Sequence, residues 1–247
     1  MITVADLQGH WQRDWIEAQG TRDETTRVHW LQARATYADI RVPLDRPRLS
    51  GACLADLPQP VLARLLAAEG FAGTITVEDG VCTWARRINL HGFPCPVDAG
   101  WMSWGPEGQL YEDGVHADYR EQWRHVPATA FTAAICNGPR TVIVVFNETT
   151  FLIITGPEGA PAQPQLRKSL EAGTAKPEEI EAAFATSCSF GHWQGEDGIA
   201  DLSTNPFNEG RAVLSRTSGG LTWHDTAFEG SLTRQTLPTS SISEVSA

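Results

Sequence analysis

The segment Phe71–Leu90, FAGTITVEDGVCTWARRINL, decides the fold class of this 247-residue chain. At its centre, Asp79-Gly80 is a two-residue turn of the kind that joins antiparallel strands, because both residue types accept a positive φ. The flanking segments, Phe71–Glu78 and Val81–Leu90, are rich in β-branched and aromatic residues, which favour strands. The segment therefore predicts a β-hairpin.

A second hairpin is expected upstream. Arg27–Gln32 (RVHWLQ) and Tyr37–Pro43 (YADIRVP) are both strand-like and are separated by four residues, 33–36. If Gln32 pairs with Tyr37 across this turn, Trp30 lies opposite Asp39 on the same face. The four segments of the two hairpins are expected to be consecutive antiparallel strands.

A helix is expected between the two hairpins. Pro58–Glu69 (PQPVLARLLAAE) has apolar residues at helical spacing and is followed by Gly70, a residue suited to a C-cap. The segment predicts a short helical insertion into a β domain.

Short strand-like segments continue toward the C-terminus at regular spacing, which favours an antiparallel sandwich or barrel. Long alternating helices are missing, which argues against a parallel α/β sheet. The further predicted strands are Gly108–Asp113, Val115–Val126, Phe131–Cys136, Thr141–Asn147, Phe151–Thr155, Ser187–Trp193, Ile199–Leu202, Arg211–Arg216, Leu221–Asp225 and Ser231–Leu237.

A linker and a small repeat suggest two related halves. Residues 156–165 are rich in Pro, Gly and Ala, and Lys176–Ala185 is a candidate helix with Pro177 near its start. The tetrapeptide Gly9–Gln12 (GHWQ) recurs as Gly191–Gln194.

The expected organisation is a first barrel over residues 1–130, with a helical insertion near 58–69. A second barrel-like half follows over residues 131–237 and includes the linker and helix at 156–186. Residues 238–247 are expected to form a mobile polar tail.

Four motifs occur in the same order as in a known family. They are Tyr37-Ala38-Asp39-Ile40-Arg41-Val42-Pro43, Phe71-Ala72-Gly73-Thr74, Asp98-Ala99-Gly100 and Tyr119-Arg120-Glu121-Gln122-Trp123. In this order the first half of the chain resembles the yeast HRI family, named for interaction with a casein kinase. The Gly9-x-Trp11 start is similar to the lipocalin first-strand signature. The resemblance implies an all-β chain of two calycin-like (lipocalin-like) barrels with no established catalytic role.

Composition excludes several classes of partner. Lys and Arg total 19 against 30 Asp and Glu, and the net charge of −11 repels nucleic acid and anionic membrane surfaces. The N-terminus lacks a secretory signal and no apolar stretch is long enough to span a bilayer, so a cytoplasmic location is expected.

Sequence motifs give no support for a cofactor. The five cysteines are scattered without a C-x-x-C pair, so reduced thiols are expected. The seven histidines form no metal-site spacing, and the usual hydrolase, nucleotide and dinucleotide motifs are missing. We expect neither a metal nor a cofactor, and the sequence predicts no oligomeric state.

Strand alternation defines the candidate site. In a barrel, successive side chains point alternately to the lumen and outward. One predicted face carries Trp30, Gln32, Tyr37, Asp39 and Arg41. Two further faces carry Trp84 with Arg86, and Tyr119 with Glu121 and Trp123.

Binding of a small apolar or aromatic molecule in a barrel cavity is the first functional hypothesis. The expected contacts are Trp30, Tyr37, Arg41, Trp84 and Trp123, which combine apolar surface with a few polar groups. For Asp39 and Arg41, the alternative is an exposed cross-strand ion pair, with Trp30 packed in the core. For Trp84 and Arg86, the alternative is ordinary surface stacking.

The second hypothesis is a cofactor-independent lyase or isomerase in the same cavity. Glu121 or Asp39 would be the general base or acid, and Arg41 or Tyr119 would stabilise negative charge. This function requires Glu121 or Asp39 to face the cavity without an Arg partner. The competing interpretation of Glu121 is a buried ion pair with Arg41 or Arg86. A third hypothesis, a non-catalytic protein-interaction module, requires an exposed apolar patch.

Overall fold

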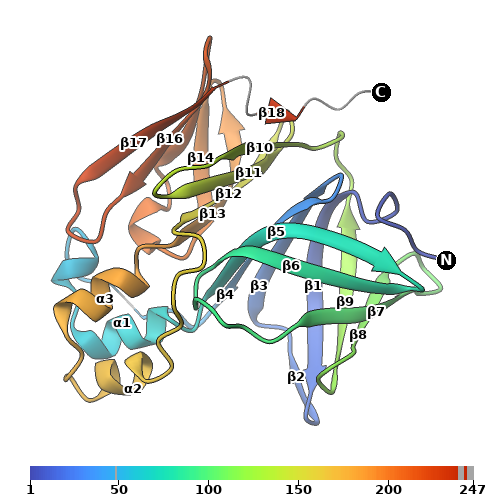
Figure 1. Cartoon of the computed structure of the whole chain (residues 1–247), viewed down its shortest axis with the longest axis horizontal. Helices are drawn as coiled ribbons and strands as arrows, with labels where there is room; N and C mark the ends of the chain where they lie inside the picture. Colours follow the sequence, from blue (N-terminus) through green and yellow to red (C-terminus); the bar gives the residue numbers. More distant parts are fainter. Residues whose placement is uncertain (48, 239–241, 244–247) are drawn as a thin grey trace.

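Two antiparallel β-sheets hold most of the chain in the computed structural model, which describes residues 1–47, 49–238 and 242–243. Figure 1 shows the first sheet, in blue to green, packed beside the second, in yellow-green to red, with the helices grouped at one side of both. The predicted all-β, barrel-like fold class is confirmed.

The first sheet is a closed barrel. Its strands follow one another in an antiparallel meander, and β1 pairs with β9 as well as with β3. Closure leaves no long unpaired edge. The strands are β1 (Gly9–Ala18), β2 (Thr21–Asp23), β3 (Thr26–Ala33), β4 (Thr36–Pro43), β5 (Glu69–Glu78), β6 (Val81–Asn89), β7 (Asp98–Trp104), β8 (Leu110–Gly114) and β9 (Tyr119–Val126).

The second sheet is a curled antiparallel meander that runs from β17 to β10 and ends on β18. Its first and eighth strands approach each other, since Nε2 of Gln235 on β17 lies 3.3 Å from Sγ of Cys136 on β10. The strands are β10 (Thr132–Cys136), β11 (Thr141–Phe146), β12 (Thr150–Gly156), β13 (Ser187–Gln194), β14 (Asp197–Ser203), β15 (Ala212–Thr217), β16 (Gly220–Thr226), β17 (Leu232–Pro238) and β18 (Ile242–Ser243).

The C-terminal tail was expected to be mobile from residue 238 onward. Pro238 ends β17, and Ile242 and Ser243 pair with β10 as β18. Positions 239–241 and 244–247, which make up the rest of the expected tail, lie outside the described residues.

Both predicted hairpins are confirmed, and the first has the predicted register. Gln32 pairs with Tyr37 and Trp30 pairs with Asp39 between β3 and β4. Asp79 and Gly80 join β5 to β6 with φ values of 50° and 85°, as a two-residue turn requires.

The described residues include three short α-helices. Helix α1 (Gln59–Leu65) lies between β4 and β5 of the first sheet, and α2 (Leu166–Glu171) and α3 (Pro177–Ala183) lie between β12 and β13 of the second. Single 3₁₀ turns occur at Leu54–Asp56 and Pro206–Asn208. The sequence predicted α1 and α3 but not α2, and it made α1 too long. Pro177 is near the start of α3, as expected.

The predicted C-cap role of Gly70 is wrong. Helix α1 ends at Leu65 with Leu66 as its C-cap, and Gly70 lies in β5, where it pairs with Ile40. A Cβ atom at Gly70 would lie 2.8 Å from Cβ of Cys188 on β13, closer than such atoms approach. Glycine is therefore required here because the two sheets touch.

Two other expectations differ from the structure. Strand β9 begins at Tyr119, because residues 115–118 form a bend after β8 and not the start of a strand. The repeated tetrapeptide lies in β1, the first strand of its meander, and in β13, the fourth strand of the other. These positions are not equivalent, so the repeat gives no support for a duplication.

An apolar core joins the two sheets. The outward-facing side chains of β3–β6 pack against side chains of β10–β14. Strand β4 is consequently covered on both of its faces. The largest members of this core are Leu31, Ile40, Val42, Ile88, Phe131, Ile143, Val145, Leu152, Ile154 and Leu202.

Replacing Gly70 by Ala tests the contact between the sheets. The added methyl group must displace Cys188 or its strand, so we expect a loss of about 1–3 kcal/mol in the free energy of unfolding. Gly138→Ala is the matched control, because the described atom nearest to its added Cβ, the carbonyl oxygen of Arg140, lies at 3.4 Å, an ordinary contact. Urea unfolding measures both, and equal stability of the Gly70→Ala and wild-type proteins would refute the close contact.

Candidate functional site

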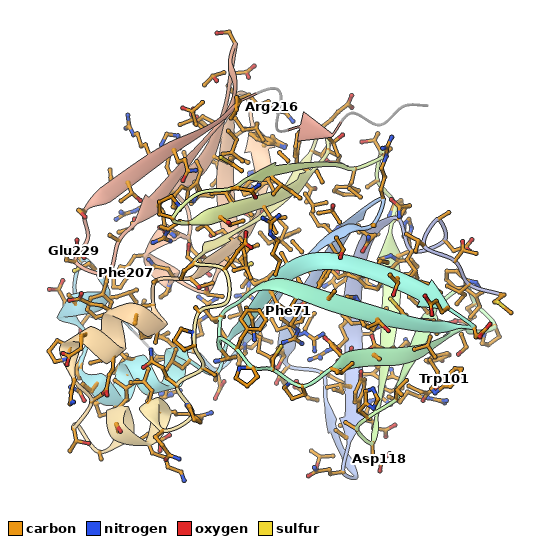
Figure 2. All side chains as sticks on the ribbon, in the orientation of Figure 1. Phe71, Trp101, Asp118, Phe207, Arg216 and Glu229 are labelled. Carbon is orange, nitrogen blue, oxygen red and sulfur yellow. The ribbon has the colours of Figure 1, made fainter. Side chains whose placement is uncertain are left out.

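The lumen of the first barrel holds the side chains that the sequence singled out. Five of the predicted site residues, Trp30, Asp39, Arg41, Trp84 and Trp123, line one internal cavity together with Phe71, Asp98 and Glu112. Phe71, labelled in Figure 2, projects from β5. These five side chains, from separate strands, thus lie together in the lumen.

This internal cavity is too small for an organic ligand. Its volume is about 10 Å³, room for one water molecule. The ring centroid of Trp30 lies 5.7 Å from those of both Trp84 and Trp123 in edge-on contacts, and these rings fill the lumen.

Ion pairs engage both candidate carboxylates. Nη1 of Arg13 lies 2.5 Å from Oε1 of Glu121, and Nη1 of Arg41 lies 3.3 Å from the same oxygen. Nε of Arg41 donates to Oδ1 of Asp39 at 3.0 Å. The enzyme hypothesis required Glu121 or Asp39 to lack an Arg partner, and neither residue meets this requirement. The alternative of a buried ion pair with Arg41 is present, and Arg13 adds a partner that the sequence analysis missed.

Burial changes the ionisation of Asp39. Desolvation raises its pKa to about 6, against the opposing effect of the Arg41 charge. At neutral pH Asp39 is thus ionised and its negative charge is balanced by Arg41.

Glu112, which the sequence analysis missed, is the centre of a second buried group. The hydroxyl of Tyr119 donates to its Oε1 at 2.6 Å, and Nε1 of Trp123 donates to its Oε2 at 3.2 Å. Burial and the nearby charge of Glu121 raise the pKa of Glu112 well above its usual value. The sequence does contain a signal for Glu112. In β8 it lies two residues after the buried Leu110, on the same face of the strand.

The two predicted tyrosines, Tyr119 and Tyr37, both have raised pKa values. Burial and the neighbouring Glu112 raise the pKa of Tyr119. The pKa of Tyr37 is also raised by burial, and its hydroxyl has no hydrogen-bond partner among the described residues. Gln32, on the same face, accepts a hydrogen bond from Nε1 of Trp30 at 3.0 Å.

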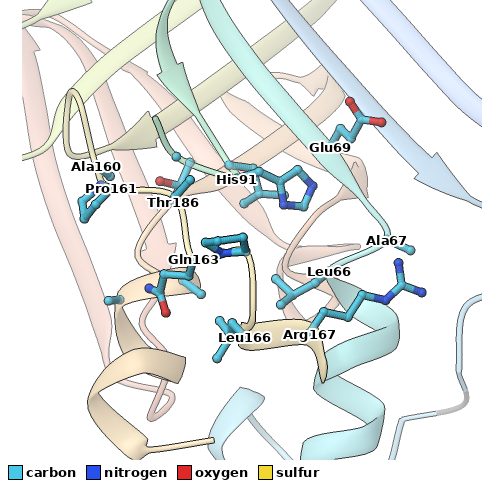
Figure 3. A pocket seen from close by; sticks show the side chains of 16 residues that line it. Leu66, Ala67, Glu69, His91, Ala160, Pro161, Gln163, Leu166, Arg167 and Thr186 are labelled. Atoms are coloured by element: carbon cyan, nitrogen blue, oxygen red, sulfur yellow. The ribbon is translucent and has the colours of Figure 1, made fainter. Parts of the chain in front are cut away.

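A larger cavity lies outside both sheets. The volume of this outer cavity is about 420 Å³. Figure 3 shows it between the end of α1, the first turn of α2, α3 and the ends of β5 and β6. The lining residues are Leu66, Ala67, Glu69, Leu90, His91, Gly92, Ala160, Pro161, Ala162, Gln163, Pro164, Leu166, Arg167, Ala182, Ala183 and Thr186.

The linker between β12 and α2 forms one wall of this outer cavity. The amide of Phe93 donates to the carbonyl of Ala160 at 2.7 Å, and the amide of Ala162 donates to the carbonyl of Phe93 at 2.8 Å. Gly92 makes the approach possible, because a Cβ there would lie 2.6 Å from the backbone nitrogen of Ala162. The linker is thus fixed to the first sheet.

Few polar side chains enter the outer cavity. Nε2 of His91 donates to the carbonyl of Ala68 at 3.0 Å. Arg167 makes only an exposed pair with Glu171 at 3.3 Å. None of the predicted site residues lines this space, since the sequence identified residues 156–165 as a connector only.

The described ranges contain neither a metal-binding cluster nor a membrane-spanning helix. Within residues 1–47, 49–238 and 242–243, no group of three His, Cys, Asp or Glu side chains is arranged to bind a metal ion. In the same ranges, none of the helices has the length and apolar character needed to cross a membrane.

Comparisons with known proteins give a distant structural likeness. No family model matches the chain, and no curated protein matches it. Among solved structures, an uncharacterized protein of Saccharomyces cerevisiae, YLR301w, is similar over 93% of this chain and 84% of its own, with 10% identity and a TM-score of 0.47. Membership of the family suggested by the order of motifs stays a prediction.

Removing the charge of Glu121 is expected to destabilise the first barrel. Glu121→Gln removes the shared partner of Arg13 and Arg41, which among the described residues keep only Asp23 at 3.6 Å and Asp39 at 3.0 Å. Removing one partner from a buried ion pair costs about 3–5 kcal/mol. Asp113→Asn, which breaks the exposed pair with Arg120, is the matched control and should cost at most about 1 kcal/mol. Unfolding free energies in urea test this order, and similar losses in both variants would contradict it.

Glu112 is expected to make the protein less stable as pH rises. Its pKa is raised in the folded state, so between the unfolded value near 4.5 and the folded value the folded chain keeps a proton that the unfolded chain loses. The free energy of unfolding then falls by up to about 1.4 kcal/mol per pH unit in this window. Glu112→Gln removes this contribution.

The measurement is the difference in unfolding free energy between wild type and Glu112→Gln at several pH values from 5 upward. Contributions of other titrating groups, such as Asp39, are common to both proteins and cancel. The difference should shift in favour of the variant as pH rises, whereas parallel curves would show that Glu112 ionises normally.

Proposed function

We propose that the protein binds a small, partly apolar molecule in the outer cavity between the helices, the linker and the ends of β5 and β6. The volume of about 420 Å³ is the observation that carries the proposal. Ligand pockets typically have volumes of about 300–1,000 Å³ and apolar walls with a few polar groups.

The lining supports this choice of ligand. Leucine, proline and alanine side chains make up most of the wall, and the polar side chains are Glu69, His91, Gln163, Arg167 and Thr186. The hydrogen bonds that fix the linker to Phe93 hold one wall in place before any ligand arrives. A preformed wall lowers the entropy that binding must overcome.

Binding in the barrel lumen and catalysis there have less support. The lumen cavity of about 10 Å³ admits a water molecule, not an aromatic ligand. Asp39 and Glu121, the proposed acid and base, are held in ion pairs. The proposed function is therefore binding, without a catalytic step.

A protein-interaction function is the second candidate, because two tryptophans of β7 are exposed. Trp101 and Trp104 are 52% and 48% exposed, and Figure 2 shows Trp101 on the outer side of the first barrel. Large exposed aromatic side chains are typical of interfaces. This surface is separate from the outer cavity, so replacing both tryptophans by Ser should leave ligand binding unchanged.

N-phenyl-1-naphthylamine, a neutral dye that fluoresces in apolar surroundings, is a suitable test molecule. We expect saturable binding of one dye per chain. Ala182→Trp places an indole at the α3 wall and should weaken binding at least about tenfold, or about 1.4 kcal/mol. Ala172→Trp, at an exposed position beyond α2 that is not among the residues lining the outer cavity, is the matched control.

The result depends on the position of the added Trp. Loss of dye binding in Ala182→Trp with normal binding in Ala172→Trp supports the outer cavity. Absence of saturable binding to the wild type, or equal binding to both variants, would refute the proposal.

A further inference from the structure

We infer that the molecule in the outer cavity carries an acidic group, a carboxylate or a phosphate, which is held by arginines in an adjoining cleft. This inference rests on the proposed function and extends it to a ligand class, amphipathic organic acids. The cleft has a volume of about 100 Å³ and shares two lining residues, Ala67 and Arg167, with the outer cavity.

Three arginines reach this cleft from three separate segments. Arg46 follows β4, Arg64 belongs to α1 and Arg167 belongs to α2. In Figure 3 the Arg167 side chain extends past Leu66 toward Ala67, the residue common to both spaces. One ligand can thus place its acidic group in the cleft and its apolar part in the outer cavity.

In the described ranges, two of these arginines, Arg64 and Arg167, are not held in a buried ion pair. Within the described part of the chain, Arg64 has no carboxylate at ion-pair distance, and its Nη2 donates to the backbone carbonyl of Asp45 at 2.7 Å. Arg167 has only the exposed pair with Glu171 at 3.3 Å. Arg46 is paired with Glu209 at 2.8 Å and also donates to the carbonyl of Ser203. Two guanidinium groups therefore remain available to an anion.

Local electrostatics favour an anion despite the acidic chain. The net charge is −11, yet arginines outnumber carboxylates in the cleft, where Asp45 is the acidic lining residue and Glu69 lines the larger cavity. Burial lowers the pKa of Arg46, against the opposing effect of its partner Glu209. Arg is the residue best suited to bidentate binding of carboxylate and phosphate.

The test compares two dyes that share one ring system. 8-Anilino-1-naphthalenesulfonate is N-phenyl-1-naphthylamine with an added sulfonate, so the ratio of their dissociation constants isolates the contribution of the acidic group. We expect the sulfonate to bind at least about tenfold more tightly at low salt. The preference should decrease as salt is raised.

Arg64→Gln combined with Arg167→Gln should abolish this preference while affinity for the neutral dye is retained. Arg124→Gln, an exposed arginine on β9 of the first barrel, is the matched control and should preserve the preference. Arg64→Lys with Arg167→Lys keeps the charge and should retain part of it.

Competition identifies the natural chemistry more closely. Octanoate should displace the sulfonate dye at least about tenfold better than 1-octanol, which lacks the charge, and better than inorganic phosphate, which lacks the apolar chain. Equal displacement by octanol, or by inorganic phosphate, overturns the inference.

The two proposals fail in different ways. If the neutral dye binds and the sulfonate gives no advantage, the acidic ligand is refuted and the outer cavity remains a binding site. If neither dye binds saturably, the proposed function itself fails. A preference that persists in the double Gln variant refutes the role of these arginines.

Discussion

Side chains such as Ile40 and Ile88 on the outside of the first barrel are buried by Ile143 and Leu152 of the second sheet. A closed barrel has its own apolar interior, so this second contact covers β4 on both faces. The close approach at Gly70 belongs to the same contact. The helices and the linker then fill the edge of the contact, and the outer cavity lies where they meet. The position of the candidate site is therefore a consequence of how the sheets pack.

The charged interior of the first barrel explains why its lumen is not the binding site. Arg13, Arg41 and Glu121 form a buried network, with Arg41 over the rings of Phe71 and Trp123, and charges removed from water require close partners. A ligand that entered this space would have to replace both the partners and the aromatic packing. The ion-pair network and the aromatic rings therefore stabilise the barrel and leave no space for a ligand.

Local patterns predicted those parts of the fold that depend on neighbouring residues. The turn at Asp79-Gly80 and the pairing of Gln32 with Tyr37 follow from residue type and alternation. Gly70 was misassigned because its role depends on Cys188, far away in the sequence.

The candidate site was harder to predict for the same reason. Alternation showed correctly that Trp30 and Asp39 share a face, but not that the enclosed volume is filled. The outer cavity joins Leu66 to Pro161 and Ala182, which no periodic pattern relates. The hydrogen bonds between the linker and Phe93 also connect residues far apart in the chain, so they carry no local signal.

The attachment of the linker to Phe93 has a thermodynamic consequence. The walls of the outer cavity come from segments on either side of the linker, so an occupant contacts the first sheet and the helices together. Its binding free energy adds to the packing of these parts and is lost when they separate. Occupancy and the integrity of the whole chain are then linked equilibria, and the concentration of the ligand sets how firmly the two halves are held together.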